Sequence, residues 1–242
     1  MKIDLPIVVI GHSHTYSLKK GIEDNLSEGL FSKDSAEFTI IDASQVSPQI
    51  SGGYVTQEFL DGFDKNSHFV SMLGGNLHNV FGLIEHPTKF DFFLDRETGG
   101  SPDLSREIIP YHLMRLHFEN TIKANPINGI KKYKDYFLGK AIHLASPPLI
   151  ADDDFITATT VYFKDKLHYG IAPDSLRKKL CDLHADVFRS ACEEIGLRYV
   201  SPPGEALDAS GFLLREYWAD STHATRAYGR LLHRQIMEAL SP

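Results

Sequence analysis

The sequence has few of the features that mark disulfide-stapled proteins. Cys181 and Cys192 are the only cysteines among 242 residues, and both fall in one predicted helix. At about 1.5 Å per residue they lie about 16 Å apart along its axis, which excludes a disulfide bond between them. We expect both to be small, partly buried side chains.

Long hydrophobic runs are also missing. The first apolar run, Ile7 to Ile10, is too short for a signal-peptide core or a membrane span. We therefore expect a cytoplasmic protein with no membrane span. No glycine-rich nucleotide-binding loop or other cofactor motif is present, so no cofactor is expected.

An excess of basic residues is likewise absent. Lys and Arg total 25 against 32 Asp and Glu, which makes the net charge −7 with histidine neutral, and such a balance repels polyanions. The single basic cluster, residues 131–134, is typical of a solvated helix face. We expect no nucleic-acid partner.

The composition that is present suits a soluble globular protein. Hydrophobic residues make up 42% and charged residues 24% of the chain, enough for one sizeable core. No repeat, low-complexity tract or linker-like run divides the sequence. We therefore predict one domain over residues 1–242, and the sequence leaves the oligomeric state open.

Alternating strand and helix patterns predict an α/β fold. Apolar or β-branched runs predict five strands, at residues 6–11, 38–42, 68–73, 141–145 and 198–200. Helical patterns lie between them, at residues 16–26 and 173–195. This order predicts a three-layer α/β/α sandwich with a mostly parallel, doubly wound sheet of about five strands, the first of them central.

The third and fourth strands are separated by about sixty residues, more than one crossover helix requires. We therefore predict an insertion around residues 77–137, with Pro110 and Pro126 marking helix starts. The aromatic segment at residues 89–94 suits core packing, with an edge strand or a lid as alternatives.

Ser13 lies just past the first predicted strand, where an open parallel sheet has its ligand-binding crevice. A serine at this place could instead cap the following helix. Near the other end of the chain, Asp220 precedes His223 by three residues. An Asp at this spacing can accept the imidazole Nδ1 proton and leave Nε2 to take a proton from serine, although residues 220–222 could also cap the last helix.

Two glycine-containing loops follow the second and third strands. Gly74 and Gly75 permit close backbone approach, and the amide of Asn76 can donate to an oxyanion. Gly52 and Gly53 offer unencumbered backbone N–H groups for the same purpose, although glycine pairs are common in plain turns.

These segments together resemble the SGNH (GDSL-like) hydrolase family, whose blocks supply Ser, Gly, Asn and His in this chain order. Ser13 corresponds to the serine block, Gly52 or Gly53 to the glycine block, Asn76 to the asparagine block, and residues 220–223 to the final Asp-x-x-His block. The resemblance implies a flavodoxin-like SGNH fold and a serine esterase, with a small-molecule or carbohydrate ester as substrate.

The resemblance also implies roles for these residues. Ser13 is the expected nucleophile, His223 the base and Asp220 its orienting partner. Asn76 and the backbone N–H groups of Ser13 and Gly52 or Gly53 are the expected oxyanion donors, and His12, His14 and Gly75 are weaker candidates for substrate binding.

Two positions depart from the family pattern. His12 stands where the family has an Asp before the serine, and Leu77 stands where it has an Asp after the asparagine. Neither position is the nucleophile, base or orienting acid. The departures leave open an unusual subfamily, an acyltransferase or a relative without activity.

Two other functions compete with esterase activity. Residues 11–14 (Gly-His-Ser-His) resemble a block of calcineurin-like metal-dependent phosphoesterases, and residues 76–78 resemble their Asn-His ligands. That family, however, places its Gly-His-x-His block near the C-terminus, so the order here is inverted, and we assign no metal ligands. A non-catalytic binding protein on the same fold is the other alternative.

Overall fold

The computed structural model describes residues 2–44, 50–51, 54–94 and 101–241. Its main sheet has five strands: β1 (Ile7–Gly11), β2 (Phe38–Asp42), β5 (His68–Met72), β8 (Ala141–Leu144) and β9 (Arg198–Val200). They are all parallel, in the order β2-β1-β5-β8-β9. The predicted doubly wound α/β sheet is confirmed.

The position of β1 differs from the prediction, because β5 and not β1 occupies the middle of the sheet. β1 still has a strand on each edge, and its residues are buried along its whole length. A continuous β-branched run indicates burial on both faces, which every interior strand of such a sheet experiences. The run therefore predicts an interior strand without distinguishing the middle one.

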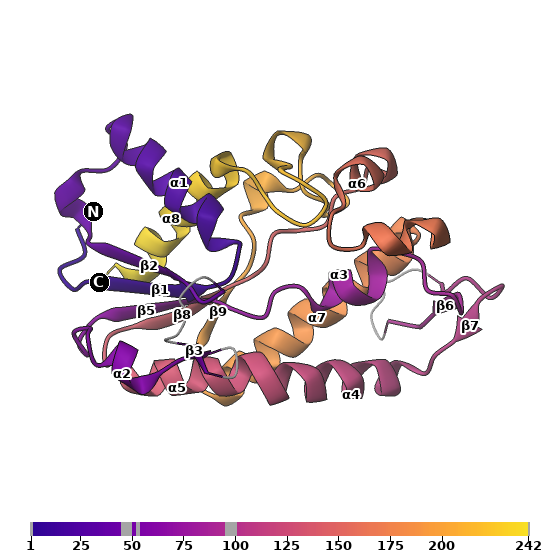
Figure 1. Ribbon diagram of the computed structural model, residues 1–242, viewed down its shortest axis with the longest axis horizontal. Coiled ribbons are helices and arrows are strands. Elements are labelled where there is room, and N and C mark those ends of the chain that lie inside the picture. The colour runs from indigo at the N-terminus through magenta and orange to yellow at the C-terminus, as the bar shows by residue number, and fades with distance from the viewer. Residues whose placement is uncertain (1, 45–49, 52–53, 95–100, 242) are drawn as a thin grey trace.

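Helices cover both faces of this sheet (Figure 1). The larger ones are α1 (Thr15–Ser27), α4 (Tyr111–Ile122), α5 (Asn128–Tyr136), α7 (Asp174–Glu194) and α8 (Arg226–Leu240). Ile7 and Val9 of β1 pack in one cluster with residues of α1 and α8, whereas Val8 and Ile10 pack in another with α4, α5 and α7. This alternation of side chains creates the three layers.

The two helices that border the site pack unusually closely. A Cβ atom on Gly21 of α1 would lie 2.2 Å from the backbone carbon of Gly229 in α8. Only glycine permits such an approach. The contact brings together the chain segments before α1 and before α8, which carry Ser13 and His223.

Shorter elements complete the fold: β3 (Ile50–Ser51), β4 (Tyr54–Val55), α2 (Gln57–Leu60), α3 (Leu77–Gly82), β6 (Phe90–Asp91), β7 (Glu107–Ile108) and α6 (Asp153–Thr159). β6 pairs with β7 in a separate two-stranded sheet, so residues 89–94 do not extend the main sheet. Phe90 and Phe92 are buried in the core, as the core-packing interpretation predicts. The single domain and the insertion at 77–137 stay predictions.

The two prolines between β5 and β8 behave differently. Pro110 immediately precedes α4, as predicted. The prediction for Pro126 is wrong, because this residue lies inside a π-helical segment, Lys123–Ile127, that joins α4 to α5. Proline has no N–H to donate, and a single wide π turn accommodates the resulting defect in the helical hydrogen bonding.

Both cysteines lie on α7 and are free; Cys192 is buried and Cys181 is partly buried, as expected. Among the described residues, no helix is long and apolar enough to cross a membrane. The cytoplasmic location stays a prediction.

Candidate active site

Ser13 lies in the turn between β1 and α1, beyond the carboxyl end of the sheet. His14, not Ser13, is the N-cap residue of α1, and its side chain makes no capping hydrogen bond. The hydroxyl of Ser13 is instead 2.7 Å from Nε2 of His223, 210 residues away in the sequence. The capping interpretation of Ser13 is therefore wrong.

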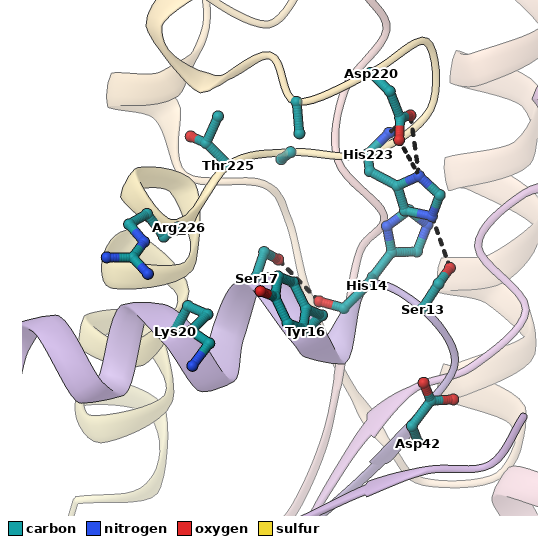
Figure 2. Close-up of a pocket in the computed structure, with 12 residues that line it drawn as sticks. Ser13, His14, Tyr16, Ser17, Lys20, Asp42, Asp220, His223, Thr225 and Arg226 are labelled. Atoms are coloured by element: carbon teal, nitrogen blue, oxygen red, sulfur yellow. Dashed lines mark hydrogen bonds and ion pairs between the residues drawn. The ribbon is translucent and has the colours of Figure 1, made fainter. Parts of the chain in front are cut away.

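A tight loop before α8 holds His223 against Asp220. Nδ1 of His223 donates to the Asp220 carboxylate, at 2.9 Å from Oδ2 and 3.0 Å from Oδ1. The same carboxylate accepts the backbone N–H groups of Thr222 and His223, each at 2.9 Å. The last helix begins only at Arg226 with Thr225 as its N-cap, so Asp220 orients the imidazole and does not cap the helix (Figure 2).

Hydrogen bonding keeps Asp220 ionised. Partial burial alone would raise its pKa, but the hydrogen bonds from His223 and from the backbone of Thr222 outweigh burial and lower the pKa to about 2. An ionised Asp220 holds the proton of His223 on Nδ1. The lone pair of Nε2 then faces the hydroxyl of Ser13, as a general base requires.

A second histidine lies directly behind the first. The ring of His14 is 5.0 Å from that of His223, centre to centre, with the planes inclined at 49°, and only 9% of His14 is exposed. Burial, and then the nearby His223, lower the pKa of His14 to about 4. His14 is therefore a neutral, buried ring beside the partly exposed imidazole of His223.

Further histidines lie in the core beyond His14. We call His14, His78, His143 and His184 the histidine cluster, and each is buried. The rings of His78 and His184 are 5.0 Å apart. Burial is the main cause that lowers their pKa values, to about 4 for His184, about 3 for His143, and well below the ordinary value for His78.

Asn76 follows β5, the strand next to β1, and is the N-cap residue of α3. Its Oδ1 accepts a hydrogen bond from Nδ2 of Asn79 at 2.7 Å, and Asn79 is only 6% exposed. This bond occupies the acceptor end of the Asn76 amide and points its donor end the other way. Asn79 is a residue that the sequence reasoning missed, although the Asn-x-x-Asn spacing on a helix start is a readable signal.

The glycines before Asn76 are needed for their backbone geometry. Gly74 has φ +76°, a conformation that other residues rarely adopt. A Cβ atom on Gly75 would lie 1.6 Å from the hydroxyl oxygen of Ser146. The predicted close approach to the backbone is thus present at Gly75, whereas Gly52 and Gly53 lie outside the described residues.

A cavity of about 570 Å³, here the serine cavity, opens beside Ser13 and His223. Tyr16, which is 67% exposed, and Lys20 line it along α1, and Arg226 lines it from α8 (Figure 2). Sequence reasoning had not selected these three residues. Tyr16 and Lys20 follow Ser13 at intervals of three and seven, which places them along one side of a helix.

His12 lines a different cavity, together with Asn76 and Gly75. Burial, partly offset by Asp42, lowers the pKa of His12. In the part of the chain that the structure describes, no three His, Cys, Asp or Glu side chains are grouped so that they could hold a metal ion.

Comparison with known proteins rests on structure. A scan against protein-family models and a search of curated protein sequences gave no match. Among solved structures, the periplasmic domain of a lipopolysaccharide acetyltransferase from Salmonella ser. Paratyphi A aligns with 99% of this chain and 84% of its own, with TM-score 0.51 and 14% identity. The chain has the SGNH hydrolase fold.

A GDSL-like lipase from Bacteroides thetaiotaomicron is also similar in structure, covering 97% of this chain and 88% of its own, with TM-score 0.47 and 14% identity. Within the SGNH fold of our chain, Ser13 follows β1, Asn76 follows β5, and His223 precedes α8. β1 and β5 are parallel neighbours, so Ser13 and Asn76 follow adjacent strands at the same edge of the sheet, and His223 reaches Ser13 there.

Proposed function

We propose that the protein is a serine esterase that cleaves carboxylic esters through an acyl-enzyme, with Ser13 as nucleophile, His223 as base and Asp220 as the acid that orients it. The observation that carries the proposal is the hydrogen-bonded chain from Ser13 Oγ through His223 to Asp220, with distances of 2.7 and 2.9 Å. A nucleophile, a base within hydrogen-bond reach and a third group that orients the base form the arrangement that acyl transfer requires.

In the first step, Ser13 Oγ attacks the ester carbonyl carbon while its proton passes to Nε2 of His223. The carbonyl oxygen becomes an oxyanion, which the amide of Asn76 and the backbone N–H of Ser13 stabilise. The Asn79 hydrogen bond supports this role, because it holds the Asn76 amide with its donor end available. Gly52 or Gly53 is a further proposed donor, on the family resemblance alone.

The oxyanion then collapses and breaks the bond to the alkoxy oxygen. His223 delivers its proton to that oxygen, so that the alcohol leaves and the acyl group stays on Ser13. Water attacks the acyl carbon while His223 takes its proton. His223 then returns that proton to Ser13 Oγ as the bond between Oγ and the acyl carbon breaks and the acid leaves. A sugar hydroxyl in place of water would complete an acyl transfer, the activity for which the Salmonella protein is named.

A fluorophosphonate probe tests the nucleophile and the base together. Intact-mass analysis should find one adduct on the wild-type protein and none on folded Ser13→Ala or His223→Ala protein. Unlabelled wild-type protein would contradict the proposal. Bound metal with chelator-sensitive phosphatase activity would then favour the phosphoesterase, and ligand binding without turnover would favour a binding protein.

A further inference from the structure

A second, more apolar cavity lies on the other side of the proposed site. Its volume is about 300 Å³, and it lies next to Asn76 and His12, the residue before Ser13. Its walls include Leu73 and Val80 on one side and Ile122 and Pro126 on the other. We call it the apolar cavity.

The walls of the apolar cavity come from segments that hold each other in place. Val80 is one helical turn after Asn76 on α3, and its N–H bonds to the Asn76 carbonyl at 3.1 Å. Opposite, the π-helical segment brings Pro126 so close to the glycine turn that a Cβ on Gly74 would lie 2.4 Å from the Pro126 Cβ. The π turn therefore shapes a wall of the cavity, and such turns are frequent at functional sites.

The position of His223 determines which part of an ester each cavity takes. The base must reach the leaving oxygen to protonate it, and His223 lines the serine cavity together with Lys20, Thr225 and Arg226. The alcohol portion therefore belongs in that polar cavity. The carbonyl oxygen points at Asn76, which also lines the apolar cavity. The acyl chain therefore extends into that cavity.

We infer that the apolar cavity is the acyl-binding pocket and that the substrates are esters of apolar acyl chains longer than acetyl. This inference rests on the proposed esterase function. A volume of 300 Å³ is at the small end of ligand pockets, yet an acetyl group, with one methyl beyond its carbonyl, leaves most of it empty. The pocket suits chains of several carbons, and the far end of a long lipid chain would lie outside it.

Chain length supplies the first test. Each methylene that enters an apolar pocket contributes enough free energy to raise kcat/KM about fourfold. With p-nitrophenyl esters, kcat/KM should therefore rise roughly tenfold or more from acetate to butyrate. It should rise again to hexanoate and gain nothing further for palmitate, whose extra methylenes lie outside the pocket. A profile that decreases from acetate onward would overturn the inference.

The decisive variant is Val80→Trp, which fills the pocket from an exposed helix position (Val80 is 54% exposed). The hexanoate-to-acetate ratio of kcat/KM should fall at least tenfold. Leu113→Trp is the matched control, since Leu113 is a 48% exposed apolar residue on α4 and is not among the residues lining this cavity; its ratio should equal that of wild type. Val80→Ala enlarges the pocket and should shift the preferred acyl chain to a longer one. This variant tests the same inference if Val80→Trp does not fold.

The alcohol portion supplies the last comparison. With the acyl group kept as acetate and the alcohol varied, Val80→Trp should keep the wild-type order of alcohol preference. A changed alcohol order with an unchanged acyl profile would reverse the assignment of the two cavities. Absence of Ser13-dependent turnover of any ester is a different result, because it rejects the proposed function itself.

Discussion

Two histidines 5.0 Å apart, His223 and His14, experience opposite environments. His223 is partly exposed and lies between a carboxylate and a hydroxyl, each within hydrogen-bond distance of one ring nitrogen. His14 is buried, and its Nδ1 has no hydrogen-bond partner among the described residues. The same side chain is thus a candidate base in one place and a neutral packing element in the other, because solvent access and a carboxylate decide whether an imidazole can carry charge.

The largest loss of activity is expected when His223 or one of its two hydrogen-bond partners is replaced. His223→Ala and Ser13→Ala should each lower kcat by about 10⁴-fold or more, because they remove the base or the nucleophile. Asp220→Asn should approach that loss, because the amide favours the wrong imidazole tautomer. Steady-state ester hydrolysis measures all three, and His112→Ala on the exposed surface of α4 is the control. Activity of His223→Ala near that of His112→Ala would remove His223 from the mechanism.

The next largest loss of activity is expected at the start of α3, where the N-cap residue Asn76 and its partner Asn79 lie beside the site. Asn76→Ala should keep the fold and lower kcat about 10²- to 10³-fold through loss of an oxyanion donor. Asn79→Asp should also lower kcat, since a carboxylate accepts from Asn76 Nδ2 and turns the amide oxygen toward the oxyanion.

A double-mutant cycle separates this orienting role from a structural one. If Asn79 acts only through Asn76, then adding Asn79→Asp to Asn76→Ala lowers kcat no further. Asn128→Asp, at an exposed position of α5, is the control for the same chemical change. Fully additive losses would mean that Asn79 does not act through Asn76.

The buried histidines should make the stability of the folded protein sensitive to acid. The pKa values of His14, His143 and His184 are lowered in the folded protein, to about 4, 3 and 4. Below the ordinary value of about 6.5 the unfolded chain binds protons that the folded protein does not. Stability should therefore be intact above pH 6.5 and fall as the pH drops toward 4, by up to about 1.4 kcal/mol per pH unit for each histidine.

Urea unfolding at several pH values between 7.5 and 4.5 measures this slope. His184→Gln should reduce the slope by up to about 1.4 kcal/mol per pH unit, whereas His112→Gln, at an exposed position, should leave it unchanged. Equal slopes in the two variants would show that the buried ring takes up a proton without unfolding.

The smallest effect is expected at His14 itself. His14→Phe keeps a flat ring behind His223 and removes only the nitrogens, so kcat should fall by far less than the roughly 10²-fold or more that a general base supplies. The same change at His223 should abolish turnover. A collapse of kcat in folded His14→Phe protein would show that His14 takes part in proton transfer.

Much of the fold could be predicted because its signals are local. The predicted strands at 38–42 and 198–200 coincide with β2 and β9, the two edge strands of the sheet, because β-branched and aromatic residues suit a pleated, half-buried surface. Pro126 misled the prediction, because a missing N–H can either start a helix or sit in a π turn. The surrounding packing decides between these outcomes.

Part of the candidate site could also be predicted. Ser13, Asp220 and His223 are identified from their resemblance to the SGNH blocks, because each residue has a plain capping alternative when it is considered alone. Asn79, Tyr16 and His14 could not be assigned in this way. Their roles depend on which side of a helix faces the site and on how deeply each is buried, which is a property of the assembled layers.

By itself, the sequence determined an interior β1, the alternation of strands and helices, and the chain order of serine, asparagine and histidine. Only the tertiary structure decided that Ser13 Oγ lies 2.7 Å from Nε2 of His223, 210 positions later in the chain, and that one cavity opens at these two residues while a more apolar one lies beside His12 and Asn76. The reason is physical: strand and helix patterns act over a few residues, whereas proximity and burial depend on close packing such as that of Gly21 against Gly229.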